Sequence, residues 1–281
     1  MDFAEQGGYL EGSSTGKLMH RFAYRCLVVA VLLALVCQSP AAADELVKFP
    51  SAAPPTATGI QGYMTKPKGA GPFPAVVLLH SCLGFPSDRR SIGSMLAGWG
   101  YVALFVDDFT PRGLSDTCAV DFPEGLADAF GALAFVAKFP YVDKTRIAAV
   151  GYSQGADTAL KVASLGAASG FTLPGDLAYK AAAAFYPPCG NQVGARLRLP
   201  TLILVGAADT VTPASYCEQL ARGQSAADVK LVVYPGAGHV FNDPQFTGGK
   251  QVLGMWLQFD QRAAAQSRSE LRNFLAAKLG R

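Results

Sequence analysis

The sequence predicts an α/β fold in which a mostly parallel, twisted sheet of about seven to eight strands carries helices on both faces. Short apolar runs alternate with helical patterns along the chain, as they do when crossover helices connect parallel strands. Several runs are almost continuous in Ala, Val, Leu and Ile, which is typical of strands buried on both faces. Half of the 281 residues are hydrophobic and 16% are charged, a composition that suits a packed core.

The expected elements follow one another from residue 60 to the C-terminus. Strands are expected at residues 60–66, 74–80, 101–106, 146–151, 181–186, 200–205 and 229–234. Helices are expected at residues 87–98, 125–139, 155–165, 214–224 and 267–279. The last helix has apolar residues at spacings of three and four, which share one face: Leu271, Phe274, Leu275 and Leu279. Residues 49–59 are expected to be irregular, and residues 240–267, which include Trp256 and Phe259, to line or cover a site.

The first 43 residues have the pattern of a secretory signal peptide. The basic residues Lys17, Arg21 and Arg25 precede an apolar run of 12 residues, 26–37. The small residues at 41–43 follow this run. Cleavage after Ala43 predicts a periplasmic or secreted protein with one domain over residues 44–281. A membrane anchor is the alternative, but spanning hydrocarbon takes about 20 apolar residues, so no stable span is expected after cleavage. Met19 is an alternative start, because acidic residues precede it.

Charge and cysteine content exclude several classes of function. The formal net charge is +3 with no basic run behind it, so no nucleic-acid partner is expected. The chain has three histidines and neither a Cys-x-x-Cys nor a His-Glu-x-x-His motif, so no metal is expected. Two of the six cysteines fall in the signal, which leaves Cys82, Cys118, Cys189 and Cys217. Four cysteines can pair in three ways, and disulfides are expected because they persist outside the cytosol. Free buried thiols are the alternative.

A nucleophile elbow follows the strand expected at 146–151. The residues Gly151-Tyr152-Ser153-Gln154-Gly155 form a G-x-S-x-G motif between an apolar strand and an Ala-rich helix. Strand and helix meet there in a sharp turn, which requires small flanking residues and holds the serine hydroxyl above the sheet. The helix N-terminus directs its amides at negative charge that develops in acyl transfer. The motif predicts the α/β-hydrolase fold with Ser153 as nucleophile; a purely structural turn is the alternative.

His239 is the expected general base for Ser153. Of the three histidines, His20 lies in the signal, and His80 ends a strand that precedes the nucleophile. The α/β-hydrolase fold places its base last in the chain. His239 lies in a Gly-rich loop after the final expected strand, and it is therefore the histidine in the required place.

Asp209 is the expected acid that orients His239. It follows the strand expected at 200–205, where a loop carboxylate can accept the imidazole N–H and fix the tautomer. The alternative role for Asp209 is a helix N-cap, but Thr212 is the better candidate for capping the next helix. Ser153, Asp209 and His239 then occur in the chain order nucleophile, acid, base.

Backbone amides are expected to form the oxyanion hole. One is the amide of Gln154, which follows the nucleophile. The other comes from the loop after the second expected strand, where Cys82 and its neighbour Leu83 are the candidates. Removal of one such donor costs about 3 kcal/mol of transition-state stabilisation.

At this point the sequence resembles the dienelactone hydrolase family. The resemblance runs from about residue 60 to the C-terminus and rests on GPFPAVVLLH, WGYVAL, the elbow, LVGAAD and GAGHVF. It implies a compact α/β hydrolase without a large lid that acts on esters or lactones without a cofactor. Two positions depart from the family: Ser153 stands where the dienelactone hydrolases proper have cysteine, and Ser81 where they have glutamate. The lactone substrate is therefore not carried over.

Three further residues are candidates for substrate binding. Arg112 lies after the third expected strand, and an arginine in this region of the family clamps a substrate carboxylate, which a guanidinium can do with two hydrogen bonds. A surface or Asp-paired arginine is the alternative. His80 and Tyr152 are the other candidates.

The cysteines suit this arrangement in one particular pairing. A Cys82–Cys118 disulfide would tie the oxyanion loop to the Pro-Arg-Gly segment, and a Cys189–Cys217 disulfide would brace the loop of the acid. The sequence therefore predicts a serine hydrolase that cleaves ester or lactone bonds of a small molecule through an acyl-serine intermediate. A secreted serine peptidase and a non-catalytic binding protein on the same fold are the alternatives.

Overall fold

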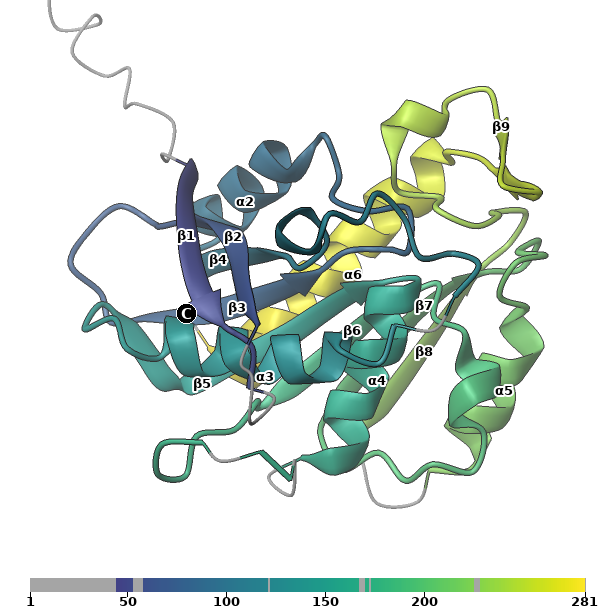
Figure 1. Cartoon of the computed structure of the whole chain (residues 1–281). Coiled ribbons are helices and arrows are strands. Elements are labelled where there is room, and N and C mark those ends of the chain that lie inside the picture. Colours follow the sequence, from purple (N-terminus) through teal and green to yellow (C-terminus); the bar gives the residue numbers. More distant parts are fainter. Residues whose placement is uncertain are drawn as a thin grey trace, which may run out of the picture. The chain divides into compact units, whose positions relative to one another are not determined.

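The computed structural model describes residues 44–52, 58–120, 122–166, 170–171, 173–224 and 228–280 (Figure 1). The expected signal peptide and the alternative start at Met19 lie outside the described residues. Among the described residues, no helix combines the length and the apolar character that crossing a membrane requires.

The described residues contain an eight-stranded sheet in the order β1-β2-β4-β3-β5-β6-β7-β8. Its strands are β1 (Asp44–Pro50), β2 (Gly59–Thr65), β3 (Phe73–Leu79), β4 (Val102–Asp107), β5 (Val142–Tyr152), β6 (Ala181–Phe185), β7 (Thr201–Gly206) and β8 (Val229–Tyr234). The pairs β1·β2 and β2·β4 are antiparallel, and every later pair from β4 to β8 is parallel. The predicted α/β-hydrolase fold is confirmed, including the mostly parallel sheet.

The strand that the sequence analysis missed is β1. It overlaps the segment expected to be irregular, but Val47 and Phe49 alternate with exposed neighbours and are themselves buried. This period of two is that of a strand with one covered face. The proline-rich composition after residue 50 concealed a short edge strand, which pairs with β2 along its whole length.

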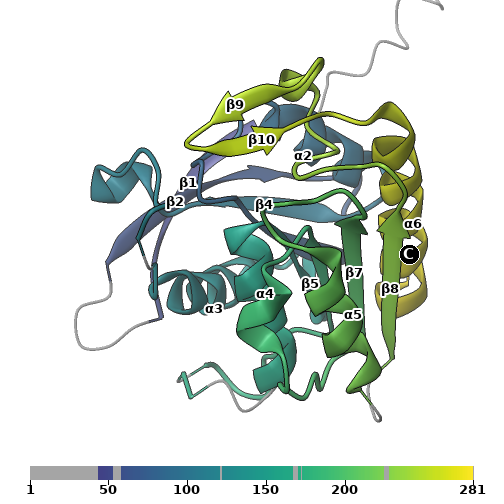
Figure 2. The same cartoon turned by 90° about the vertical axis from the view of Figure 1, so that its right-hand side faces the viewer.

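Helices cover both faces of the sheet. They are α2 (Arg89–Gly98), α3 (Gly125–Val136), α4 (Gln154–Leu165), α5 (Ala214–Arg222) and α6 (Gln261–Leu279). Figure 2 shows α3, α4 and α5 on one side and α2 and α6 on the other. Within β3, Val76 and Leu78 pack in the cluster that includes Leu96 of α2, whereas Ala75 and Val77 face α3 and α4. Alternate side chains of one strand thus serve two cores.

Helix α6 begins six residues before its expected start. The Asp260 side chain caps it by accepting a hydrogen bond from the Ala263 amide at 2.7 Å. Its first two turns bury only small residues, Ala263, Ala264 and Ser267. The periodicity of large apolar residues is therefore absent at the start of this helix, although the helix itself is well capped.

The segment before α6 holds a single-turn 3-10 helix at Pro244–Phe246 and a two-stranded sheet of β9 (Lys250–Val252) and β10 (Met255–Leu257). Leu257 is buried, and its bridge with His239 joins this segment to the loop after β8. The segment therefore sits beside the carboxyl ends of the parallel strands, where α/β folds place their sites.

Candidate active site

Ser153 occupies a strained turn between β5 and α4. Its φ is 51° and its ψ is −111°, a conformation that L-residues rarely adopt and that is typical of functional sites. The flanking glycines allow strand and helix to meet: a Cβ on Gly151 would lie 2.0 Å from the Gly155 carbonyl oxygen, and one on Gly155 2.3 Å from that of Leu79. The local sequence therefore forms the elbow expected from the motif.

The structure brings Ser153, His239 and Asp209 into one hydrogen-bonded chain. His239 Nε2 lies 3.0 Å from Ser153 Oγ, and His239 Nδ1 lies 2.7 Å from Asp209 Oδ2. All three side chains are buried. A carboxylate accepts only, so Nδ1 carries the proton and Nε2 is free to accept one from the serine hydroxyl.

The Asp209 carboxylate is held by more than His239. Its Oδ1 accepts the Val211 and Thr212 amides at 2.8 and 2.9 Å, and its Oδ2 accepts the Thr212 hydroxyl at 2.8 Å. Burial acts to raise the pKa of Asp209, but the hydrogen bond and charge of His239 and the Thr212 contacts outweigh it and lower the pKa. The prediction that Thr212 caps α5 is wrong, because no side chain caps this helix. The Thr212 hydroxyl donates to the Asp209 carboxylate instead.

Gln154 and Cys82, two of the expected oxyanion donors, lie around the same cavity as Ser153. This cavity of about 540 Å³ is also lined by Thr212. The third candidate, the Leu83 amide, donates to Ser81 Oγ at 3.3 Å. Its hydrogen is directed at a side chain of its own loop, which makes Cys82 the better second donor.

The four cysteines of the described chain form two disulfides, Cys82–Cys118 and Cys189–Cys217, as the sequence analysis expected. The first joins the oxyanion loop to the segment after β4, and the Thr117 amide adds a hydrogen bond to the Cys82 carbonyl at 2.9 Å. The second joins the segment after β6 to α5. Both are compatible with an oxidising compartment.

His80 lies beside the oxyanion loop and forms an ion pair. It follows β3 directly, and its Nε2 lies 2.8 Å from Oδ1 of Asp108, which follows the neighbouring strand β4. Its Nδ1 lies 2.8 Å from the carbonyl oxygen of Ser81. Burial acts to lower the pKa of His80, but the contact with Asp108 outweighs it, so the pKa is raised.

Arg112 is paired with an aspartate. Its guanidinium contacts both carboxylate oxygens of buried Asp128, at 2.8 and 3.0 Å, and donates to the Asp108 carbonyl at 2.7 Å. The sequence analysis left a substrate clamp and an Asp-paired arginine open. The structure has the Asp-paired arginine, whose two terminal nitrogens bind the Asp128 carboxylate.

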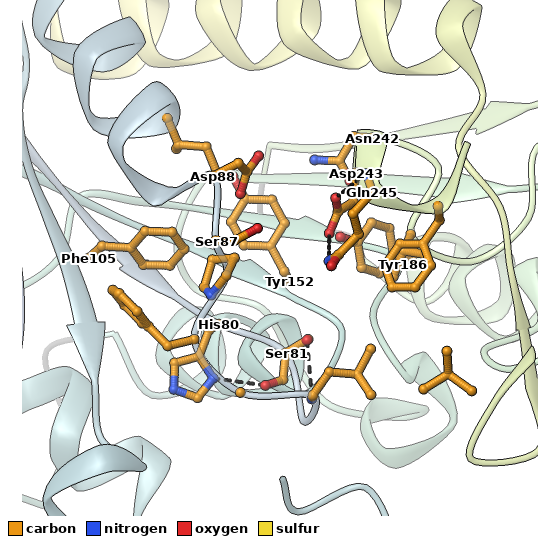
Figure 3. A pocket seen from close by; sticks show the side chains of 18 of the residues that line it. His80, Ser81, Ser87, Asp88, Phe105, Tyr152, Tyr186, Asn242, Asp243 and Gln245 are labelled. Atoms are coloured by element: carbon orange, nitrogen blue, oxygen red, sulfur yellow. Dashed lines mark hydrogen bonds between the residues drawn. The ribbon is translucent and has the colours of Figure 1, made fainter. Parts of the chain in front are cut away.

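A second cavity, of about 350 Å³, is lined by Tyr152 and Val240, the chain neighbours of Ser153 and His239. Figure 3 shows His80 and Ser81 at one side of it and Asp88, Asn242 and Asp243 at the other, with Tyr152 and Tyr186 between them. His80 and Tyr152, both expected to bind substrate, line this cavity, and residues of the segment 240–252 also line it. Part of the segment expected to line or cover a site thus lines this cavity, and the secondary structure of that segment was not predicted.

Tyr186 is a site residue that the sequence analysis missed. Its ring meets the imidazole of His239 edge-on, with centroids 4.8 Å apart, and its φ is 40°. It follows β6, the strand beside β5, so its position at a carboxyl end next to the elbow was the available signal. Among the described residues, no group of His, Cys, Asp and Glu could hold a metal ion.

Comparison with known proteins agrees with this architecture. Residues 60–279 match the profile of the Dienelactone hydrolase family. The chain belongs to the dienelactone hydrolase family. Membership makes it a hydrolase that acts on ester bonds, in a family whose activity is ester and lactone hydrolysis.

Individual relatives are distant. An uncharacterized protein of Mycobacterium tuberculosis is 27% identical over 267 residues, which cover 82% of this chain and 92% of that protein. The crystal structure of a dienelactone hydrolase from Anabaena variabilis superposes with a TM-score of 0.62 at 18% identity, over 85% of this chain and 99% of that one. The crystal structure of a dienelactone hydrolase-like promiscuous phosphotriesterase from metagenomic libraries superposes with a TM-score of 0.66 at 22% identity, over 85% of this chain and 100% of that one. At these identities the solved structures support the fold alone.

Proposed function

We propose that this protein is a serine hydrolase that cleaves ester or lactone bonds of small molecules through an acyl-serine intermediate. The observation that carries the proposal is the continuous chain from Ser153 Oγ through His239 to the Asp209 carboxylate, with contacts of 3.0 and 2.7 Å. Nucleophile, base and orienting acid are within hydrogen-bond reach of one another, which is the geometry that activation of a serine requires.

Each residue then has one role in the reaction. Ser153 Oγ attacks the carbonyl carbon while His239 Nε2 takes the hydroxyl proton, and the amides of Gln154 and Cys82 bind the oxyanion that forms. Collapse of the tetrahedral intermediate breaks the bond to the leaving oxygen, which receives the proton from His239. A water molecule, activated by the same imidazole, then attacks the acyl-serine and returns Ser153. Asp209 stabilises the imidazolium in both halves of the cycle.

The site favours small, largely uncharged substrates. The cavity of about 540 Å³ is lined by Ser153 and the cavity of about 350 Å³ by its neighbour Tyr152, and together they provide room for an acyl group and a leaving group. Arg112 is already paired, and the family glutamate is replaced by Ser81. The carboxylate-bearing lactones of the dienelactone hydrolases proper are therefore not the proposed substrates.

A fluorophosphonate probe tests this proposal directly. The purified protein is treated with the probe and assayed on short-chain aryl esters, a lactone panel and a peptide library. We expect labelling of Ser153 and ester hydrolysis, and both should vanish in Ser153→Ala. Ser164→Ala, which changes a serine near the end of α4, serves as the control that should keep both labelling and ester hydrolysis.

Three outcomes would contradict the proposal. Absence of labelling in the wild-type protein favours a non-catalytic binding protein. Ester hydrolysis that persists in Ser153→Ala removes the assigned nucleophile. Cleavage of peptides in preference to all esters and lactones identifies a peptidase.

We also propose that the protein is exported after removal of residues 1–43. The two disulfides support this proposal, because such bonds persist in oxidising compartments. Expression of the full chain followed by N-terminal sequencing of the protein recovered outside the cytosol should give Asp44 as the first residue. Recovery of the intact chain in the cytosol contradicts it.

A further inference from the structure

Both ring nitrogens of His80 face groups that accept hydrogen bonds. The Ser81 carbonyl oxygen lies 2.8 Å from Nδ1, and a carboxylate oxygen of Asp108 lies 2.8 Å from Nε2. A carbonyl cannot donate, and an ionised carboxylate cannot either. A neutral imidazole would therefore direct one lone pair at an oxygen, whereas the imidazolium satisfies both contacts. With Asp108 ionised, the hydrogen bond to the carbonyl and the ion pair with the carboxylate together favour a His80 that carries two protons, and the raised pKa of His80 agrees with this.

The carbonyl that His80 contacts belongs to the peptide unit that carries the Cys82 amide. This peptide is trans, since the only cis bond among the described residues is Gly71–Pro72. In a planar trans peptide the C=O and N–H bonds point in opposite directions. With the Ser81 oxygen directed at His80, the Cys82 N–H is directed away from it, and Cys82 lines the cavity that Ser153 also lines.

We propose that His80, as a buried imidazolium, is a positioning residue that fixes and polarises the Ser81–Cys82 peptide so that the Cys82 amide serves as an oxyanion donor. The inference rests on the proposed hydrolase function. A charged donor on the carbonyl oxygen draws electrons from the peptide nitrogen and strengthens the opposite N–H as a donor. Figure 3 shows the His80–Ser81 contact at the edge of the cavity.

The surroundings of His80 hold this charge in place. Asp108 is its ion-pair partner, Asp107 at the end of β4 adds a second negative charge nearby, and Arg112 binds the Asp108 backbone carbonyl. The ring of Phe109 packs edge-on against the imidazole, with the two ring centroids 4.4 Å apart. On the far side of the peptide, the Cys82–Cys118 disulfide and the Thr117 amide hold the residue that donates to the oxyanion.

Asp108→Asn tests the charge on His80 without removing the ring. The amide removes the negative charge that retains the second proton, so His80 becomes neutral at lower pH. We expect kcat on an aryl ester to fall about tenfold at pH 8 with KM nearly unchanged, because charged donors are about twice as strong as neutral ones. The loss should diminish as the pH falls and the imidazole is protonated again. Asp228→Asn, an exposed change at the ion pair with Lys278, is the matched control.

His80 variants test the hydrogen bond itself. His80→Ala should lose kcat by a factor of about 10², comparable to the removal of one oxyanion donor. His80→Gln retains a neutral N–H donor and should recover part of that loss. Binding of a trifluoromethyl ketone, which forms a tetrahedral adduct with the serine, should weaken in parallel with kcat in every variant. Thermal unfolding shows whether each variant is folded.

Nuclear magnetic resonance gives a reading that needs no catalysis. After loss of His20 with the signal, two of the three histidines remain, so ¹⁵N-labelled imidazoles give two sets of signals. We expect His80 to keep both nitrogens protonated at pH 8 in the wild-type protein and to titrate in Asp108→Asn. A neutral His80 at pH 7, or an unchanged kcat in folded Asp108→Asn, overturns this inference while probe labelling of Ser153 still supports the hydrolase. Absence of labelling overturns the proposed function separately.

Discussion

Two buried histidine–aspartate pairs stand on either side of the elbow, and they differ in the group that faces the ring nitrogen not paired with aspartate. His80 and Asp108 follow β3 and β4, and His239 and Asp209 follow β8 and β7, so each pair joins neighbouring parallel strands at their carboxyl ends. The nitrogen-to-oxygen distances are 2.8 and 2.7 Å. The remaining nitrogen of His239 faces the Ser153 hydroxyl, whereas that of His80 faces a carbonyl.

On our proposal, this difference separates a general base, His239, from a buried cation, His80. A hydroxyl can donate, so the second nitrogen of His239 can be unprotonated and accept the serine proton. A carbonyl cannot donate, and we therefore infer that the second nitrogen of His80 carries a proton. The carboxylate partner alone therefore does not define the role of a buried histidine. The group at the other nitrogen decides it.

The largest effect is expected from His239→Ala. Without its base Ser153 is not activated, and kcat should fall by a factor on the order of 10⁶, as it does when a triad histidine is removed elsewhere. Steady-state kinetics on an aryl ester and the rate of fluorophosphonate labelling measure the loss. An equal loss in His80→Ala would abolish the distinction between the two pairs.

Asp209→Asn should have the next largest effect, a decrease of about 10⁴ in kcat. The amide can present its NH₂ group to Nδ1, which favours the tautomer that cannot accept the serine proton. The corresponding change in the other pair, Asp108→Asn, is expected to cost only about tenfold, since it weakens a donor and leaves the base intact. Measurement of kcat for both variants under one set of conditions compares the two pairs directly. Similar losses in the two variants would contradict the different roles assigned to the pairs.

The grouping of Ser153, Asp209 and His239 was predictable from the sequence because the alternatives were few. Only three histidines are present, and the elbow, the loop after β7 and the loop after β8 carry the expected residues in order. The contact between His80 and Asp108 was not predictable in this way. It depends on β4 lying beside β3, a neighbour relation that sheet order creates and that local patterns do not contain.

The other features that were not predicted depend either on contacts between distant residues or on weak local patterns. The pairing of Arg112 with Asp128 joins residues 16 positions apart through a loop and α3, and only the folded chain shows which partner the guanidinium takes. The first turns of α6 and the strand β1 were missed because small or alternating residues give weak periodic signals. The elbow, by contrast, is specified locally by Gly151 and Gly155.

The two disulfides should differ in their effect on catalysis. Each is expected to contribute about 2–4 kcal/mol to the free energy of unfolding. The pair Cys82→Ala with Cys118→Ala should also lower kcat several-fold, because it frees the peptide that His80 holds from the other side. The pair Cys189→Ala with Cys217→Ala is the matched control, with stability lost to a similar extent and kcat changed less. Equal effects on kcat would show that the bond at Cys82 acts on stability alone.

The smallest effect is expected in how stability varies with pH, and it has opposite sign for the two pairs. The pKa of His80 is raised, so its contribution to stability is complete below its ordinary value of 6.5 and is lost as the pH rises through the folded-state pKa. The pKa of Asp209 is lowered, so its contribution is complete above its ordinary value of 3.8 and is lost as the pH falls through the folded-state pKa.

Urea unfolding of the wild-type protein, Asp108→Asn and Asp209→Asn over a range of pH separates these contributions. The stability difference between wild type and Asp108→Asn should shrink at alkaline pH, and the difference for Asp209→Asn should shrink at acidic pH. Differences that vary in the same direction would mean that His80 does not carry the charge assigned to it. In that case the Gly84 amide, which donates to the Ser81 carbonyl at 3.1 Å, the Thr117 amide and the disulfide would hold this peptide without the imidazolium.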